Sequence, residues 1–387
     1  MKAPRILTMV VVLALVGRAS GQTLTTLYQF SGGTDGHNPV SGLIQASDGY
    51  FYGTTGDGEP EGGYGTLFQI SSEGTLTTLY SFGNGADGGY PSSALIQGTD
   101  GFLYGVTSGG GTNGGYGTVF KITPAGNLTT LYCFNGTDGN FPRGRLVQGS
   151  DGNLYGTTIK GGTNDLGTVF KITPAGDLTT LYCFNGTDGF YPYAGPVQAD
   201  DGYFYGTTEG GGAKDWGTVF KITADGKLRN LYSFSNGADG GGPFAALVWG
   251  GDGHFYGTTA SGGTNHSGTV FKINRAGRLK TLYRFSGGTD GANPEGTLVR
   301  GSDGNFYGTT SYGGAYGWGT AFKITPAGTL TTLHQFSNDA DGGIPYGELI
   351  QGADGSFYGT AWTGGTNGVD GTVFKLSVPL NSTPHRH

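Results

Sequence analysis

Cysteine, charged residues and long apolar runs are all scarce in this chain of 387 residues. Its two cysteines, Cys133 and Cys183, are too few for a fold held together by many disulfides. They also occupy the same place, LYCF, in consecutive repeats, so their Cα atoms should lie beyond the roughly 7 Å that a bridge allows. Charged residues make up only 13 % of the chain, which argues against a disordered polyampholyte. Apolar residues at helical spacing are missing as well, so the sequence predicts an all-β protein.

One apolar run does occur, at the N-terminus. Ile6–Val16 follows the basic residues Lys2 and Arg5 and precedes the small residues 19–21, which is the pattern of a secretory signal over residues 1–21. This run of eleven residues is shorter than the roughly 20 that cross a bilayer, although a retained anchor is the alternative. We therefore expect an exported protein (secreted, periplasmic or at the cell surface) that is not inserted in a membrane after cleavage before Gln22.

The charge of the mature chain argues against two classes of partner. Cleavage would remove Lys2, Arg5 and Arg18 and no acid, so three lost positive charges change the net charge from −7 to −10. A chain this acidic is a poor match for nucleic acid or for an anionic membrane surface.

Glycine and aromatic residues are abundant instead, with 82 Gly, 23 Tyr and 23 Phe, and they recur in one phrase. The phrase DGxFYGTT, or a close variant, appears seven times with spacings of 52, 51, 50, 51, 51 and 51 residues, which indicates a repeat architecture. Each unit divides into four β segments, expected in the fourth copy at 194–198, 203–208, 218–223 and 228–234. The Asp-Gly pair between the first two segments is a strong hairpin signal.

The ends of the repeat array predict a closed ring. The segment Leu24–Phe30 resembles a fourth strand and precedes the first set of three strands, whereas the last set ends at Ser377 without a fourth. The N-terminal segment can therefore complete the last unit and remove the open edges. We predict a seven-bladed β-propeller of four-stranded antiparallel blades over residues 22–377, with a short disordered tail over 378–387, and we expect a monomer.

The phrase DGNFYGTTxxGG followed by GTVFKITPAG, clearest over Asp303–Gly328, resembles the GloVer tandem repeat of exported bacterial proteins. The resemblance covers residues 24–377 and implies a secreted or surface protein, with no established catalytic residues. Many such proteins have a "choice-of-anchor" architecture with a C-terminal sorting segment. The residues after Ser377, VPLNSTPHRH, depart from that pattern.

Seven aspartates recur identically in the hairpins and are interpreted as turn residues. A catalytic carboxylate works in a small set with distinct environments, whereas a turn needs the same residue in every copy. These structural turn residues are Asp48, Asp100, Asp151, Asp201, Asp252, Asp303 and Asp354.

Metal and catalytic signals are weak. The best candidate for a calcium site is Asp57, Glu59 and Glu61 in one Gly-rich loop, followed by Asp339 and Asp341, although such acids are usually solvated. No cofactor is otherwise expected. The histidines do not cluster in the sequence and no GxSxG motif occurs, so no catalytic residue is assigned.

The remaining signal is a set of aromatic and charged residues in the variable loops, which should share one face of the disc. Exposed aromatic rings with scattered polar groups suit stacking on sugars or gripping a peptide, and packing between blades is the alternative. The candidate ligand-binding residues are Tyr90, Phe141, Arg143, Tyr191, Trp216, Glu295, Trp318, Tyr346 and Trp362. On the opposite face, Trp249 and Arg300 replace a glutamine that the other repeats retain.

Three functions remain open at this point. We favour a non-enzymatic exported protein that binds an extracellular glycan or protein through its variable face. A purely structural surface protein comes second. A lyase or glycoside hydrolase comes third, with acids and His37 converging at the mouth of the channel.

Overall fold

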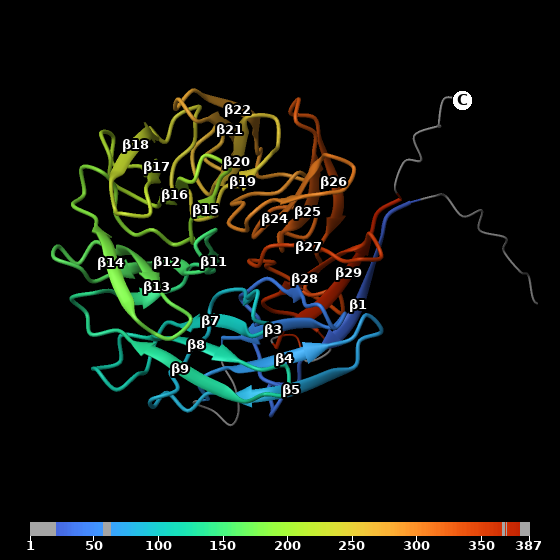
Figure 1. Ribbon diagram of the computed structural model, residues 1–387. Helices are drawn as coiled ribbons and strands as arrows, with labels where there is room; N and C mark the ends of the chain where they lie inside the picture. The colour runs from blue at the N-terminus through green and yellow to red at the C-terminus, as the bar shows by residue number, and fades with distance from the viewer. Residues whose placement is uncertain (1–20, 57–62, 366–367, 369, 380–387) are drawn as a thin grey trace, which may run out of the picture.

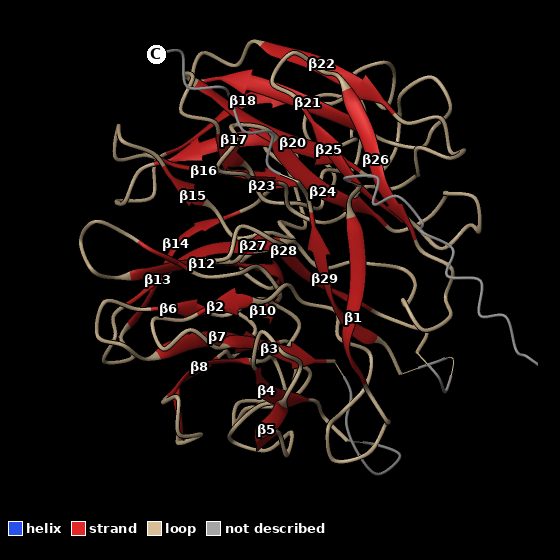
Figure 2. Cartoon of the chain, turned by 90° about the vertical axis from the view of Figure 1, so that its right-hand side faces the viewer, coloured by secondary structure: helices blue, strands red, loops and turns tan. Residues whose placement is uncertain are grey.

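The computed structural model describes residues 21–56, 63–365, 368 and 370–379. Seven small antiparallel sheets are arranged around a central axis, and the described residues contain strands and loops without a helix (Figures 1 and 2). The predicted seven-bladed β-propeller is confirmed.

Four strands build each blade, from the axis outward. The innermost strands are very short: β2 (Ile44–Gln45), β6 (Ile96–Gln97), β11 (Val147–Gln148), β15 (Val197–Gln198), β19 (Val248–Trp249), β23 (Val299–Arg300) and β27 (Ile350–Gln351). The second strands are β3 (Phe51–Thr55), β7 (Leu103–Thr107), β12 (Leu154–Lys160), β16 (Phe204–Thr208), β20 (His254–Thr259), β24 (Phe306–Thr310) and β28 (Phe357–Ala361). Blades 1 to 7 are numbered in this order.

The outer half of each blade is more regular. The third strands are β4 (Thr66–Ile70), β8 (Thr118–Ile122), β13 (Thr168–Ile172), β17 (Thr218–Ile222), β21 (Thr269–Asn274), β25 (Thr320–Ile324) and β29 (Thr372–Ser377). The outermost strands are β5 (Leu76–Ser81), β9 (Leu128–Cys133), β14 (Leu178–Cys183), β18 (Leu228–Ser233), β22 (Leu279–Arg284), β26 (Leu330–Gln335) and, in blade 7, β1 (Thr23–Gln29). Blade 3 has an additional short strand, β10 (Asn140–Pro142), paired with β12.

The N-terminal strand closes the ring. Strand β1 pairs antiparallel with β29, from Thr23 opposite Ser377 to Gln29 opposite Thr372, and the blue and red ends lie together in Figure 1. Blades 7 and 1 are also joined by the stacked rings of Phe51 and Tyr358, 4.1 Å apart. Without β1 the edge of β29 would be unpaired, so β1 gives blade 7 the same four strands as the other blades.

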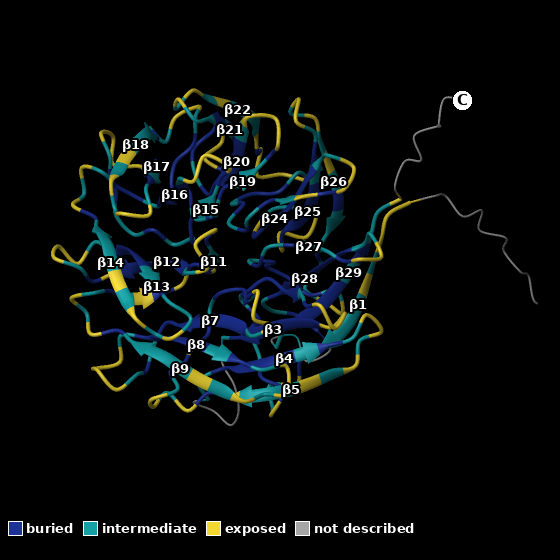
Figure 3. Cartoon of the chain, viewed as in Figure 1, coloured by how far each residue is buried: buried dark blue, intermediate teal, exposed yellow. Residues whose placement is uncertain are grey.

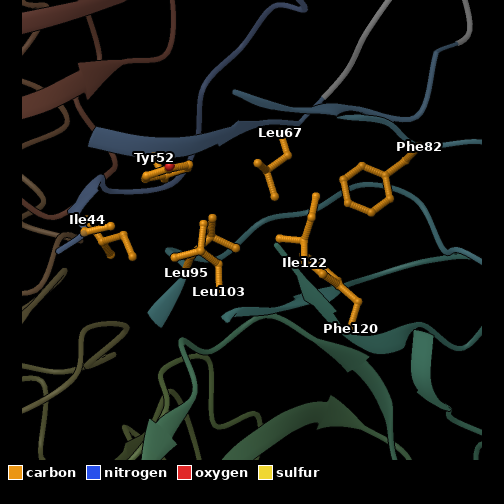
Figure 4. Packing of buried hydrophobic residues seen from close by; sticks show 9 residues of the cluster. Ile44, Tyr52, Leu67, Phe82, Leu95, Leu103, Phe120 and Ile122 are labelled. Carbon is orange, nitrogen blue, oxygen red and sulfur yellow. The ribbon is translucent and has the colours of Figure 1, made fainter. Parts of the chain in front are cut away.

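The core lies between the blades rather than within one sheet. Side chains alternate along a strand, so the Phe and the Tyr of each FYG phrase face opposite neighbours. Phe51 packs toward blade 7 and Tyr52 toward blade 2, where Tyr52 joins Leu95 and Leu103 (Figure 4). The second and third strands are buried, and the outermost strands are partly exposed (Figure 3).

The hairpin aspartates make the same contacts in every blade. Asp48 accepts a hydrogen bond from the backbone N–H of Tyr50 at 3.1 Å and one from the hydroxyl of Tyr52 at 2.6 Å. Gly49 between them has a φ of 87°, which favours glycine. Each carboxylate therefore stabilises a tight turn and accepts a hydrogen bond from the hydroxyl of a tyrosine whose ring is buried.

One expectation for the strands is wrong. The sequence predicts the innermost strand of the fourth repeat over 194–198, but only Val197 and Gln198 pair with β16. The preceding segment is drawn to the neighbouring blade, because the hydroxyl of Thr157 in blade 3 donates to the carbonyl of Ala194 at 3.0 Å. Blades approach so closely here that a Cβ on Gly195 would clash with the carbonyl oxygen of Arg145. These inner segments consequently line the axis with residues that belong to no sheet.

Candidate functional site

The inner segments of all seven blades enclose a central channel with a cavity of about 460 Å³. Each segment follows the proline of the DGxxP motif, so equivalent residues of the seven blades form rings at successive levels of the channel. The size lies within the range of small-molecule sites.

The first level contains the residues directly after each proline. Blades 3 to 7 carry large side chains here, which we call the channel mouth: Arg143, Tyr193, Phe244, Glu295 and Tyr346. Blades 1 and 2 carry the smaller Val40 and Ser92. Large side chains therefore surround the channel mouth at blades 3 to 7, and only small side chains do so at blades 1 and 2.

Aromatic contacts connect the channel mouth to the variable loops. The rings of Tyr193 and Phe244 lie 4.8 Å apart, and those of Tyr346 and Trp362 lie 5.8 Å apart. The hydroxyls of Tyr346 and Tyr312 are 3.4 Å apart. Because Trp362 and Tyr312 belong to the loops after β28 and β24, the channel mouth opens on the variable-loop face.

Charged groups at the channel mouth lack partners. Neither Arg143 nor Glu295 forms a hydrogen bond or an ion pair with another described residue. Burial raises the pKa of Glu295 to about 7, and burial also raises the pKa of Glu209 at the start of the loop after β16. A carboxyl group with a pKa near 7 can both donate and accept a proton near neutral pH.

A second pair of charges crosses the channel one level deeper. Nη1 of Arg145 lies 2.7 Å from Oε1 of Glu348, and we call these two residues the channel ion pair. Arg145 belongs to blade 3 and Glu348 to blade 7, so blades 1 and 2 separate them on one side and blades 4 to 6 on the other. The attraction of the Glu348 carboxylate raises the pKa of Arg145 above its already high value.

Three of the nine predicted ligand-binding residues, Arg143, Glu295 and Tyr346, meet at the channel mouth. Trp362 lies at its edge through its contact with Tyr346. Trp216 and Trp318 are exposed, at 44 % and 37 %, on the loops before β17 and β25, and they do not line the channel.

The other three predicted residues share a backbone feature. Tyr90, Phe141 and Tyr191 directly precede the DGxxP proline and have φ values of 58°, 55° and 55°. Hydrogen bonds hold this position between two loops: the backbone N–H of Tyr90 donates to Tyr64 at 2.7 Å, and its carbonyl accepts from Ser108 at 3.1 Å. A bulky residue in this conformation is strained, by about 1–2 kcal/mol. The backbone bonds explain the conformation, although not the choice of aromatic side chains.

Sequence reasoning missed Tyr193, Phe244 and Glu209. The first two stand directly after a DGxxP proline, in the same register as Arg143 and Glu295, so alignment of the repeats on that proline would have found them. Glu209 and Trp362 likewise occupy equivalent places after their second strands.

The predicted metal residues Asp57, Glu59 and Glu61 lie outside the described residues. In the second candidate metal site, Asp339 and Asp341, the Asp341 carboxylate is already engaged: it accepts hydrogen bonds from the backbone N–H and the hydroxyl of Ser337. Within the described ranges, no three His, Cys, Asp or Glu side chains are gathered as metal ligands would be. In the same part of the chain, no helix has the length and apolar character needed to span a bilayer.

The opposite face carries glutamine links between neighbouring blades. In five blades a Gln side-chain oxygen accepts a backbone N–H from the preceding blade at 2.8–3.0 Å, including Gln45 from Ala353 across the closure. Trp249 instead stacks against the guanidinium of Arg275, 4.7 Å from its ring centre, and Arg275 pairs with Asp200. Phe255 covers Trp249 at 4.8 Å, so this cluster replaces a missing link.

Solved structures of the same fold include two extracellular domains of candidate hybrid two component systems from B. thetaiotaomicron. They share 12 % and 13 % identity with the chain, each at a TM-score of 0.61, over 93 % and 94 % of its length. The chain spans only 40 % and 45 % of those proteins. A candidate 6-phosphogluconolactonase from Bacteroides uniformis has 16 % identity and a TM-score of 0.52, over 77 % of this chain and 84 % of its own.

These identities show a shared fold alone, and no curated protein matches the chain. The profile of the Gloeobacter/Verrucomicrobia repeat matches residues 16–200 and again 193–383, which together cover nearly the whole sequence. The chain therefore belongs to the Gloeobacter/Verrucomicrobia repeat family.

Proposed function

We propose that the protein binds a carbohydrate outside the cell, at the channel mouth. The observation that carries this proposal is the set of side chains that meet there, two of them charged and without partners among the described residues. Arg143 and Glu295 supply hydrogen-bonding charges, and Tyr193, Phe244 and Tyr346 supply rings beside them. Sugars combine hydroxyl groups with apolar C–H faces, so they need this combination of polar groups and aromatic rings.

Export rests on two further observations. The sequence of residues 1–21 has the pattern of a secretory signal. Two solved proteins of the same fold are named as extracellular domains. A purely structural role is less well supported, because a structural surface protein needs no concave site with unpaired charges.

Binding should be tested on a glycan array with the purified chain and with variants of the channel mouth. We expect Y193A and F244A to lose capture of the bound glycan, because each removes a ring that faces the cavity. The matched controls W216A and W318A also remove exposed aromatic rings, and they should retain capture because neither lines the channel. Loss of capture in the controls alone would move the site to the rim of the variable face.

A second candidate function is hydrolysis or elimination of a glycan at the same place. The observation that favours it is two carboxyl groups in unlike environments within one cavity. Glu295 is unpaired with a pKa raised to about 7, whereas Glu348 is paired with Arg145. Glycosidases and lyases separate the roles of acid and base by such differences in environment.

The two functions differ in their response to E295Q. If the protein only binds, E295Q should keep measurable affinity and no wild-type preparation should release reducing sugar or an unsaturated product. If it is an enzyme, wild-type protein should release such a product and E295Q should abolish release while still binding. Product analysis of each glycan captured on the array therefore decides between them.

A further inference from the structure

Positive charge gathers in the central channel of a chain that is acidic as a whole. We propose that the carbohydrate bound at the channel mouth is an acidic one, which carries an oxyanion group such as the carboxylate of a uronic acid or a sulfate ester. This inference rests on the proposed carbohydrate-binding function and names the class of carbohydrate.

The charges of the channel differ in balance from those of the whole chain. Acidic residues outnumber Lys and Arg by 28 to 21 in the sequence, whereas the described residues that line the channel include three arginines, two glutamates and no lysine or aspartate. Arg143 lies at the channel mouth, Arg145 in the channel ion pair, and Arg300 at the end of β23, toward the opposite face. A cavity lined with an excess of one charge attracts ligands of the opposite charge.

Two of these arginines belong to one segment of blade 3. Arg143 and Arg145 line the channel and are exposed, whereas Gly144 and Leu146 are buried, so the segment alternates between the channel and the protein interior. The Cα atoms of residues two positions apart are separated by at most about 7 Å. Both guanidinium groups can therefore contact the same ligand.

Both guanidinium groups also have hydrogen-bond donors to spare. Arg143 forms no hydrogen bond or ion pair with another described residue. Arg145 donates to Glu348 from Nη1 at 2.7 Å, which uses one of its five N–H groups, and its side chain is 51 % exposed. The planar fork of a guanidinium group matches the paired oxygens of an oxyanion.

The two glutamates of the channel offer little opposing charge. Glu348 is only 16 % exposed, and the charge of Arg145 balances its own. Burial raises the pKa of Glu295 to about 7, so in mildly acidic solution this carboxyl group is mostly neutral and can donate a hydrogen bond to an oxyanion. An acidic ligand at the channel mouth therefore meets an unpaired arginine beside carboxyl groups that are neutral or already paired.

The experiment compares each acidic carbohydrate with a neutral partner of the same backbone. The probes are polygalacturonate with its full methyl ester, and dextran sulfate with dextran, titrated calorimetrically at about pH 6, where Glu295 is mostly neutral. We expect the acidic member of at least one pair to bind about tenfold more tightly or better, because a hydrogen bond becomes charge-assisted on both sides. The pair that shows the difference identifies the oxyanion. The difference should shrink as NaCl rises from about 0.05 to 0.5 M.

The neutral probes separate this inference from the proposed function. Equal or tighter binding of the neutral member in both pairs, or capture of uncharged glycans alone on the array, would overturn this inference and leave the proposed function standing. Binding of no glycan on the array and of none of the four probes would overturn the proposed function, and this inference with it.

Variants test whether the preference for charge arises at the channel mouth. R143Q removes the unpaired charge and should reduce the ratio of acidic to neutral affinity about tenfold. Its Tm should stay unchanged, because Arg143 is exposed and bonds to no described residue. The matched control R229Q removes the same charge from an exposed arginine on the outermost strand β18 and should keep the full ratio. Equal ratios in R143Q and R229Q would overturn the proposal, because the oxyanion would then bind away from the channel.

Discussion

Replacement of Glu295 by glutamine tests the electrostatics of the channel mouth. Burial raises the pKa of Glu295 from 4.5 to about 7, so the folded protein holds a proton over a pH range in which the unfolded chain has released it. The stability that the neutral form provides is complete below pH 4.5 and is lost as the pH rises through 7. Glutamine has nearly the same shape and never ionises, so E295Q should remove this dependence.

The magnitude follows from the size of the pKa change. A difference of 2.5 between 4.5 and 7 corresponds to about 3 kcal/mol when the carboxyl group is fully ionised. An unfolding entropy of about 2.1 cal/mol/K per residue, over the roughly 355 residues from Thr23 to Ser377, converts this into about 4 °C of Tm. E295Q should therefore melt close to wild type at pH 4.5 and about 4 °C above it at pH 8.

The assay is the melting temperature of both proteins by calorimetry or circular dichroism between pH 4.5 and 8. E73Q is the control of opposite sign, because hydrogen bonds from Ser72 and Ser71 lower the pKa of the exposed Glu73, so E73Q should lose stability relative to wild type as the pH rises from 4.5. A difference between E295Q and wild type that does not vary with pH would refute the reasoning, since it would mean that Glu295 is solvated in the folded protein.

Three more predictions concern the ring itself. A double-mutant cycle of R145A and E348A, with unfolding measured in urea, should give a coupling free energy of at most about 1 kcal/mol, because Arg145 is half exposed. A coupling free energy of several kcal/mol would mean that the pair stabilises the fold. Y155F should lose about 1–2 kcal/mol of stability with its 2.8 Å bond to Asp151, whereas Y50F, which alters an exposed tyrosine, should melt like wild type. Deletion of residues 23–29 should expose the edge of β29 and cause concentration-dependent association in light scattering, and a monomer with the wild-type Tm would contradict closure by β1.

The blade architecture could be predicted from the sequence because the residues that determine it act locally and are repeated. Asp-Gly turns, alternating strands and a period near 51 residues each act over a few positions, and seven copies reinforce the pattern. Even the closure of the ring, which pairs Thr23 with Ser377 from the two ends of the repeat array, followed from counting the strands at those ends.

Only part of the candidate site could be predicted from the sequence. Arg143, Glu295 and Tyr346 were predicted from composition in variable segments, whereas Tyr193 and Phe244 were missed in the same register. The sequence could not show that the segments before the innermost strands leave their own sheets, because that depends on how closely neighbouring blades approach at the axis.

What the sequence by itself determined is the unit and the number of its copies, since both follow from local turn and strand preferences. What only the tertiary structure decided is which side chains face one another across the channel. Arg145 and Glu348 are 203 positions apart, and they meet because the ring brings blades 3 and 7 to opposite sides of a narrow axis. Burial of Glu295, and with it the raised pKa, likewise exists only in the folded ring.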